Sequence, residues 1–430
     1  MQKIIDIKVI KKIIQISLLL FSILIVSEYY IGRLTIGSDH INQYVAAKQL
    51  SIGNGLTNLA INFEDLSSPH KETLNRWPPG ISIVASPLFL IFNDIRTIHN
   101  IVAFSNLFIF IVLLFILLKL VTCNKLSNLH FLLFFLFLSF NKSFVFLSHT
   151  TDLVCVNLFM LSSIMLIKFF KNNRKIIYLL VVCFLLSLTL YFRYAYLPAI
   201  LVLPAFFSWR IIFNKKKEWK EFIISILGII VLGFPFFFHI IDINSQTSFV
   251  ASQASNSGTM GFYLENIKYA SPFPFVAFFD IFPLLKLMGF KSDFGYDRGY
   301  EYPFFVQVIF YIASIIILLP LVWLDKSIKN EKSKSIFWLF GFIFSIGLLS
   351  LIYISSLILP SQLSEYTWSW SMIPRYYSIL ILLLFISFIY LILHSHNKYL
   401  KNLLLAFFGF SFLFSLTLKT YNYTKNYTPF

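Results

Sequence analysis

Charged residues are scarce in this sequence. Asp, Glu, Lys and Arg make up 13% of the 430 residues, whereas hydrophobic residues make up 58%. A typical soluble domain is about 25% charged, so the polar side chains here are too few to cover a water-exposed surface. This balance excludes a soluble fold, intrinsic disorder and collagen-like repeats. What the chain has instead is apolar stretches of about 20 residues, each long enough to cross a bilayer.

Cysteine is also rare. Cys123, Cys155 and Cys183 lie in or beside apolar segments and lack the spacing of metal ligands, so neither a disulfide framework nor a zinc site is predicted. The net charge of +16 raises the question of nucleic acid. Its Lys and Arg residues lie in short loops between apolar segments and form no basic stripe with interleaved aromatics, so nucleic acid is not a predicted partner. No cofactor is predicted.

Apolar length predicts an all-α, polytopic membrane protein of about eleven transmembrane helices. A signal peptide is the alternative for the first apolar run, but no small-residue cleavage site follows it, so an uncleaved first span is predicted. The predicted spans are 13–33, 98–121, 127–144, 150–168, 175–192, 194–211, 220–241, 303–324, 336–358, 374–394 and 400–418.

The basic loops predict the orientation, because Lys and Arg favour the cytoplasmic side. Most of them fall on one side if the N-terminus is cytoplasmic and the C-terminus is outside. The apolar segment 80–93 has fourteen residues, which is short for a span. If it crossed, most basic loops would lie outside, so it is predicted to be a non-crossing helix.

Two long outer loops are predicted, at 34–97 and 242–302. Loops of this length are uncommon unless they have a function. The second contains the largely apolar run 276–290, which is expected to lie along the membrane surface. The chain is thus predicted to be one membrane domain, 1–430, with a catalytic first outer loop and a second outer loop that covers a cavity.

The first outer loop carries the most informative motifs. Gly37-Ser38-Asp39-His40 directly follows the first span, and a short helix is predicted over 40–50, capped by Ser38 or Asp39 and ended by Gly53 to Gly55. The spacing Tyr44-x-x-Ala47-x-x-Leu50-x-x-Gly53-x-Gly55 runs through this helix. Arg76-Trp77-Pro78-Pro79-Gly80 then precedes the apolar segment 80–93.

This combination resembles the GT-C integral-membrane glycosyltransferases, in particular the branch of the protein O-mannosyltransferases and the lipid A aminoarabinose transferases. The resemblance covers about residues 25–95. It implies transfer of a sugar from a polyprenyl-phosphate donor in the bilayer to a glycan, lipid or protein acceptor on the non-cytoplasmic face, in a bacterial plasma membrane. It also implies that Asp39 is the general base or positions the acceptor. No soluble C-terminal domain is predicted, whereas several branches possess one, and this leaves the acceptor class open.

The chemistry expected of Asp39 follows from the reaction. An acceptor hydroxyl must lose its proton as it attacks the anomeric carbon, and a carboxylate at the membrane surface can accept that proton. Direct attack inverts the anomeric centre, so one catalytic carboxylate suffices. The alternative is that Asp39 is a helix N-cap that faces water.

Three arginines are candidates to stabilise the phosphate leaving group, on which negative charge develops. Arg193 lies between two predicted spans, Arg375 opens the span 374–394, and Arg76 precedes the Pro-Pro-Gly motif. The resemblance implies phosphate contacts for Arg193 and Arg375. The alternative for each arginine is an anchor at the membrane interface, beside tyrosines or tryptophan.

Other polar residues are weaker candidates for substrate binding. They are Tyr44, Glu64, Asp65 and His149, the last in a polar cluster with Asp152. Solvated loop positions explain Glu64 and Asp65 equally well, and a helix N-cap at Thr150 or Thr151 explains the cluster. A divalent metal at Glu64 and Asp65 is conceivable by analogy with some GT-C branches, but the sequence offers no metal-binding motif to support it.

Two competing functions remain open on the sequence alone. The first is a flippase or transporter of lipid-linked glycans, and the second is a polysaccharide polymerase that would also use outer-face arginines. Transporters usually show internal repeats or helices broken in mid-membrane. Here the predicted charges gather at the outer rim and the span interiors are nearly free of charge, which favours chemistry at the surface.

Overall fold

The computed structural model describes residues 38–60, 70–74, 78–122, 151–171, 174–193, 200–212 and 217–246, with isolated positions between Leu382 and Gly409. This part of the chain is mostly helical. The predicted spans 13–33, 127–144, 303–324 and 336–358 lie outside the described residues, as does the predicted second loop beyond residue 246. The spans 374–394 and 400–418 are represented only by the isolated positions.

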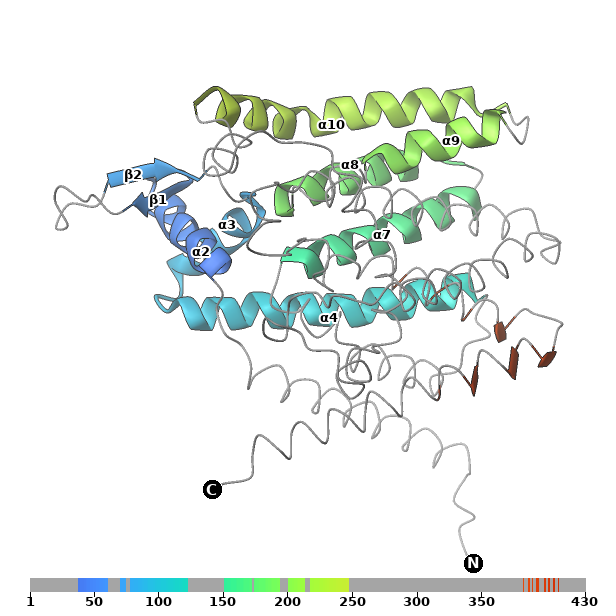
Figure 1. Ribbon diagram of the computed structural model, residues 1–430, viewed down its shortest axis with the longest axis horizontal. Helices are drawn as coiled ribbons and strands as arrows, with labels where there is room; N and C mark the ends of the chain where they lie inside the picture. The colour runs from blue at the N-terminus through green and yellow to red at the C-terminus, as the bar shows by residue number, and fades with distance from the viewer. Residues whose placement is uncertain are drawn as a thin grey trace, which may run out of the picture.

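Five helices lie side by side as a bundle (Figure 1). They are α4 (Ile95–Val121), α7 (Thr151–Lys171), α8 (Ile176–Phe192), α9 (Val202–Ile212) and α10 (Trp219–Gln246). Within the bundle α7 packs between α4 and α8, and α10 packs against α8 and α9. Among the described residues, α4 and α7 are long and apolar enough to cross a membrane, by length and composition.

These helices agree with five of the predicted spans. The predicted spans 98–121, 150–168, 175–192 and 220–241 match α4, α7, α8 and α10 within a few residues. The predicted span 194–211 corresponds to α9, whose described helix begins only at Val202 after a short 3-10 turn. Apolar periodicity predicts the presence and type of an element better than the residues at which it begins and ends.

The first outer loop forms a small layer across one end of the bundle (Figure 1). It contains α2 (Ser38–Ser51), the strands β1 (Thr57–Ala60) and β2 (His70–Thr73), α3 (Gly80–Ala85) and the 3-10 helix η1 (Ser86–Leu90). We call this end, where α4 and α7 begin and α8 ends, the α2 end of the bundle. The opposite end, where α7 ends and α10 begins, is the far end.

The predicted helix over 40–50 is present as α2. Its end follows from two glycines with positive φ, Gly53 at 80° and Gly55 at 73°, a backbone conformation that favours glycine. The antiparallel hairpin that follows pairs Thr57 with Thr73 and Ala60 with His70. The prediction of an all-α fold missed this hairpin, because its strands lack the alternation of apolar and polar residues that marks a strand in a sequence.

The predicted helix over 80–93 is present as two short pieces, α3 and η1. Pro87 lies at the start of η1, where it removes a backbone donor and interrupts α-helical hydrogen bonding. Together the two pieces run from Gly80 to Leu90, far short of the roughly 20 residues that a membrane-spanning helix needs.

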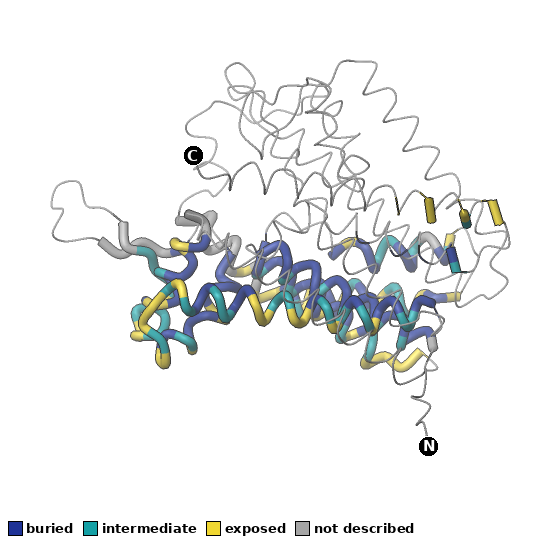
Figure 2. Tube along the Cα trace, turned by 90° about the horizontal axis from the view of Figure 1, so that it is seen from below, coloured by how far each residue is buried: buried dark blue, intermediate teal, exposed yellow. Residues whose placement is uncertain are grey.

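One apolar cluster joins the outer loop to the bundle. We call it the junction cluster, and its buried members come from α2, α3, η1, α4, α7 and α8: Tyr44, Ala47, Ile81, Ala85, Phe89, Ile98, Val102, Cys155 and Phe192. In Figure 2 the buried positions follow the inward faces of these elements, and exposed positions follow their outer surface. Burial and close packing of these apolar side chains stabilise the position of the loop layer on the bundle.

Candidate functional site

Asp39 is the second residue of α2, so it lies in the first turn of a helix that packs against the bundle. The structure describes its backbone but not its side chain. The positions one and two turns later, Gln43 and Ala46, are 2% and 0% exposed, whereas Lys48 on the opposite side of the helix is exposed. Asp39 thus shares a helix face with buried positions. Its role as a general base stays a prediction.

Tyr44 lies one turn further along α2 and forms a buried contact with α4. Its hydroxyl lies 3.1 Å from Nδ1 of His99, and the two rings meet edge to face with centroids 5.7 Å apart. Tyr44 is 1% exposed and His99 is 2% exposed. Burial raises the pKa of Tyr44 well above its usual value, because the phenolate would lose its hydration. Tyr44 therefore acts as a neutral hydroxyl.

His40 completes this cluster. Its ring lies edge-on to that of His99, with centroids 5.5 Å apart. His40 and Tyr44 are four residues apart on α2, so they occupy the same helix face. The three side chains form a polar group that is enclosed by the junction cluster and by the start of α4. Sequence reasoning did not select His99, because a single histidine within a predicted span carries no pattern.

Arg193 and Asp152 form an ion pair at the α2 end of the bundle. Arg193 Nε lies 3.3 Å from Asp152 Oδ1. Asp152 is in the first turn of α7 and is fully buried, and Arg193 is 9% exposed. Arg193 directly follows α8, where its backbone N–H donates to the Thr189 carbonyl. A cation at a helix C-terminus is favourable. Arg193 therefore balances a buried carboxylate, whatever else it binds.

The Pro-Pro-Gly motif brings the first outer loop against the end of α8, which Arg193 directly follows. A Cβ atom on Gly80 would lie 2.5 Å from the Tyr191 carbonyl oxygen and 2.8 Å from the Phe192 ring, so only glycine allows α3 to start this close to the end of α8. The Ser82 hydroxyl donates to the Gln43 carbonyl at 2.8 Å. Through α3, the helix that carries Asp39 and the helix that ends at Arg193 are held at the same end of the bundle.

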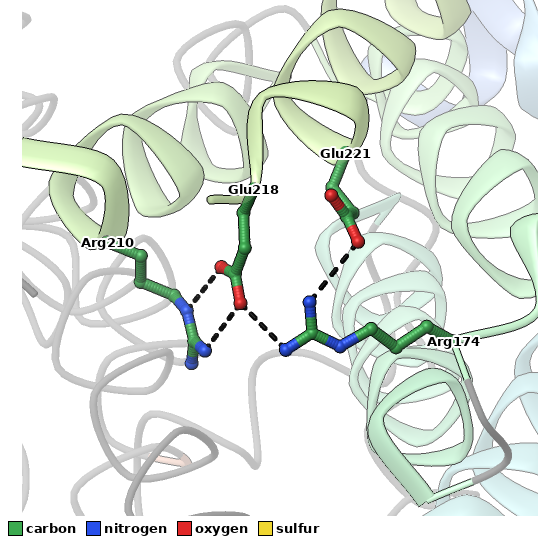
Figure 3. A network of polar contacts seen from close by, with 4 residues as sticks. All are labelled: Arg174, Arg210, Glu218 and Glu221. Atoms are coloured by element: carbon green, nitrogen blue, oxygen red, sulfur yellow. Dashed lines mark hydrogen bonds and ion pairs between the residues drawn. The ribbon is translucent and has the colours of Figure 1, made fainter. Parts of the chain in front are cut away.

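A second group of charges lies at the far end, and sequence reasoning missed it. Glu218 accepts hydrogen bonds from Arg210 at 2.6 and 2.7 Å and from Arg174 at 2.8 Å, and Arg174 also reaches Glu221 at 3.3 Å (Figure 3). The Arg210 guanidinium also lies over the rings of Phe170 and Phe206. Arg174 and Glu218 lie between predicted spans, and Arg210 and Glu221 lie at the ends of the predicted spans 194–211 and 220–241. Their pairing depends on how α7, α8, α9 and α10 pack.

The remaining predicted site residues fall outside the described part of the chain. They are Arg76, Arg375, Glu64, Asp65 and His149, so their roles stay predictions. Among the residues that the structure describes, no three His, Cys, Asp or Glu side chains are placed to hold a metal ion.

Comparisons with known proteins give little beyond the sequence reasoning. No family model matches the chain, and no curated protein matches it. Among solved structures, ArnT from Cupriavidus metallidurans bound to undecaprenyl phosphate is similar, with 9% sequence identity and a TM-score of 0.47. The match covers 86% of this chain but 58% of that structure's chain. Similarity at this level does not establish a shared fold or activity.

Proposed function

We propose that this chain is an inverting, membrane-embedded glycosyltransferase of the GT-C type. It transfers a sugar from a polyprenyl-phosphate donor to a glycan, lipid or protein acceptor on the non-cytoplasmic face. One observation carries the proposal: the helix with Asp39 in its first turn packs, through α3, on the same end of the bundle as the buried Arg193. A carboxylate base and a cation for a phosphate are the two groups that such a transfer requires.

In this reaction Asp39 accepts the proton of the acceptor hydroxyl as the hydroxyl oxygen attacks the anomeric carbon. The bond from that carbon to the phosphate oxygen breaks, and the electron pair leaves with the polyprenyl phosphate. Attack from the face opposite to the leaving group inverts the anomeric centre. The proton then passes from Asp39 to water at the membrane surface.

Arg193 stabilises the charge that develops on the leaving phosphate. A guanidinium is the preferred partner of a phosphate because its donors match the phosphate oxygens in pairs. Arg193 also pairs with Asp152 through Nε, and this contact holds the guanidinium at the α2 end of the bundle. Arg375 and Arg76 are proposed as further phosphate ligands, and Glu64, Asp65 and His149 as further residues of the substrate site. Tyr44 is proposed to serve that site through the helix it shares with Asp39, because its own side chain is buried against His99.

A transfer assay in proteoliposomes tests the base. A panel of radiolabelled polyprenyl-phosphate sugars is supplied with candidate acceptors, and wild type is compared with Asp39→Asn. Loss of a general base should lower kcat by about 10²- to 10⁴-fold. Lys48→Gln, on the opposite and exposed side of the same helix, is the matched control and should retain wild-type activity. Transfer by the Asp39→Asn variant at the wild-type rate would exclude the assignment.

A binding experiment tests the cation. Undecaprenyl phosphate is titrated into wild type, Arg193→Lys and Lys175→Gln, the last being an exposed far-end control. Arg193→Lys keeps a charge opposite Asp152 but loses paired donors, so the dissociation constant should rise while the control is unchanged. Equal affinity in all three proteins would leave Arg193 with a structural role only. Movement of intact lipid-linked sugar across the bilayer, without cleavage, would indicate a flippase instead.

A further inference from the structure

We propose that Tyr44 and His99 are positioning residues that set the orientation of α2 and, through it, the place of Asp39. This inference rests on the proposed function. Neither side chain has to touch substrate, since both are almost fully buried. Their effect is on the helix that carries the base.

The contact between them is a side-chain bridge between α2 and α4. The Tyr44 hydroxyl and His99 Nδ1 are 3.1 Å apart, and the residues are 55 positions apart in the sequence. Among the residues that the structure describes, Nε2 of His99 has no hydrogen-bond partner. The hydrogen bond to Tyr44 is therefore what orients the imidazole ring, and His40 packs against the edge of that ring.

The surroundings make this hydrogen bond directional and costly to lose. Tyr44 is a member of the junction cluster, and Ile98 and Val102 flank His99 on α4 within the same cluster. In apolar surroundings an unpaired polar atom has no water to replace its partner. Rotation of α2 about its axis would break the bridge, whereas apolar contacts alone would tolerate a small rotation.

Asp39 is sensitive to such a rotation because it lies five positions before Tyr44, in the first turn of the same helix. A helix is stiff over this distance, so rotating the helix at Tyr44 also displaces Asp39. Misplacement of a catalytic group by about 1 Å can cost about 100-fold in rate. The Tyr44–His99 bridge therefore affects turnover more than donor binding.

Three variants test the bridge in the transfer assay. Tyr44→Phe removes only the hydroxyl, and His99→Leu removes the nitrogen that faces it. His99→Asn keeps a polar atom at the δ position. Tyr44→Phe and His99→Leu should each lower kcat by about 10- to 100-fold with an unchanged KM for the donor, and His99→Asn should restore most of kcat. The double variant Tyr44→Phe/His99→Leu should be no worse than either single one.

A distance measurement tests the bridge without reference to activity. Asn42 of α2 and Arg96 of α4, both exposed, are each replaced by a non-natural amino acid that carries a ketone, and spin labels are attached to the two ketones. This labelling leaves the native cysteines in place. The distance distribution should broaden in Tyr44→Phe and His99→Leu and stay narrow in His99→Asn. An unchanged distribution in the first two variants, or a KM effect as large as the kcat effect, would overturn the inference. If the wild-type protein transfers no sugar, the proposed function fails, and the distances still decide whether the pair orients α2.

Discussion

Asp152 and Arg193 are joined by a buried ion pair that links the first turn of α7 to the residue directly after α8. The two helices are consecutive among the described elements and pack against each other along their length. The pair lies where the Pro-Pro-Gly motif docks on Tyr191 and Phe192. An arginine that balances a buried carboxylate is held in a defined place, which is also what binding a second anion requires.

Removal of one partner from this pair should destabilise the protein. Asp152→Asn keeps the shape of the side chain but removes the negative charge that faces the buried guanidinium of Arg193. Loss of a single partner of a buried pair typically costs about 3–5 kcal/mol. The expected result is a lower apparent Tm in detergent, measured by the loss of monomeric protein on size-exclusion chromatography after heating.

The double variant Asp152→Asn/Arg193→Gln serves as the control. It removes both charges, so it should recover part of the stability that Asp152→Asn loses, because a neutral polar pair can be buried at lower cost. Arg193→Gln alone completes the cycle. If the Tm losses of the two single variants simply add up in the double variant, the two residues do not interact energetically.

The far-end network provides a matched pair of glutamates. Glu218 is 2% exposed and accepts hydrogen bonds from two arginines, whereas Glu221 makes one longer contact with Arg174. Glu218→Gln should therefore cost about 3 kcal/mol or more, and Glu221→Gln should cost less than about 1 kcal/mol. Thermal unfolding of both variants in the same detergent measures the difference. Equal losses of Tm in the two variants would show that the burial of Glu218 does not determine its contribution to stability.

Gly80 should tolerate no side chain. In Gly80→Ala the new Cβ would meet the Tyr191 carbonyl and the Phe192 ring at under 3 Å, so α3 must move away from the end of α8. Limited proteolysis of the loop before Gly80 should then become faster, and any transfer activity should fall. Gly53→Ala is the control, since its Cβ meets nothing within 4 Å and is disfavoured only by the φ of 80°, a cost of about 1–2 kcal/mol. A proteolysis rate in Gly80→Ala equal to that of wild type would contradict the contact.

The start of α4 predicts a dependence on pH. Asp94 caps this helix by accepting from the Thr97 hydroxyl and from the backbone N–H groups of Thr97 and Arg96. These bonds, the Thr97 hydroxyl foremost, lower the pKa of Asp94. A lowered folded-state pKa adds stability above the unfolded-state pKa, and that stability is lost as the pH falls through the lowered value.

The expected result is that Asp94→Ala lowers the apparent Tm at neutral pH and differs less from wild type in acid. The amide oxygen of Asp94→Asn still accepts hydrogen bonds from the helix N-terminus. The apparent Tm of this variant should therefore lie between those of wild type and Asp94→Ala, and the stabilisation by its cap should change less with pH. A Tm difference between wild type and Asp94→Ala that stays constant down to acid pH would show that the charge of Asp94 adds nothing to the cap.

Much of the fold could be read from the sequence. Apolar length and period predict α4, α7, α8 and α10, because a helix that packs in lipid or in a bundle must carry an uninterrupted apolar run. The helix before Gly53 followed from its terminating glycines. The β1–β2 hairpin was missed, since its strands are short and polar.

The candidate site was predictable only as single residues. Asp39 stands out through the resemblance of the first outer loop, and Arg193 because it is a basic residue in a short turn predicted to lie on the outer side. Their relation to the rest of the site was not predictable, because it depends on contacts between helices: Arg193 with Asp152, Tyr44 with His99, and Gly80 with the end of α8. Glu218 looked like an ordinary loop charge, although three hydrogen bonds from two arginines converge on it.

The amino-acid sequence by itself determined that this chain consists largely of apolar helices with its charged residues near their ends, since that follows from local composition and period. Only the tertiary structure decided that Tyr44 meets His99, that Arg193 meets Asp152 and that Gly80 rests on α8. Contacts between distant residues depend on how helices pack against one another, and packing is a property of shape in three dimensions rather than of any one segment.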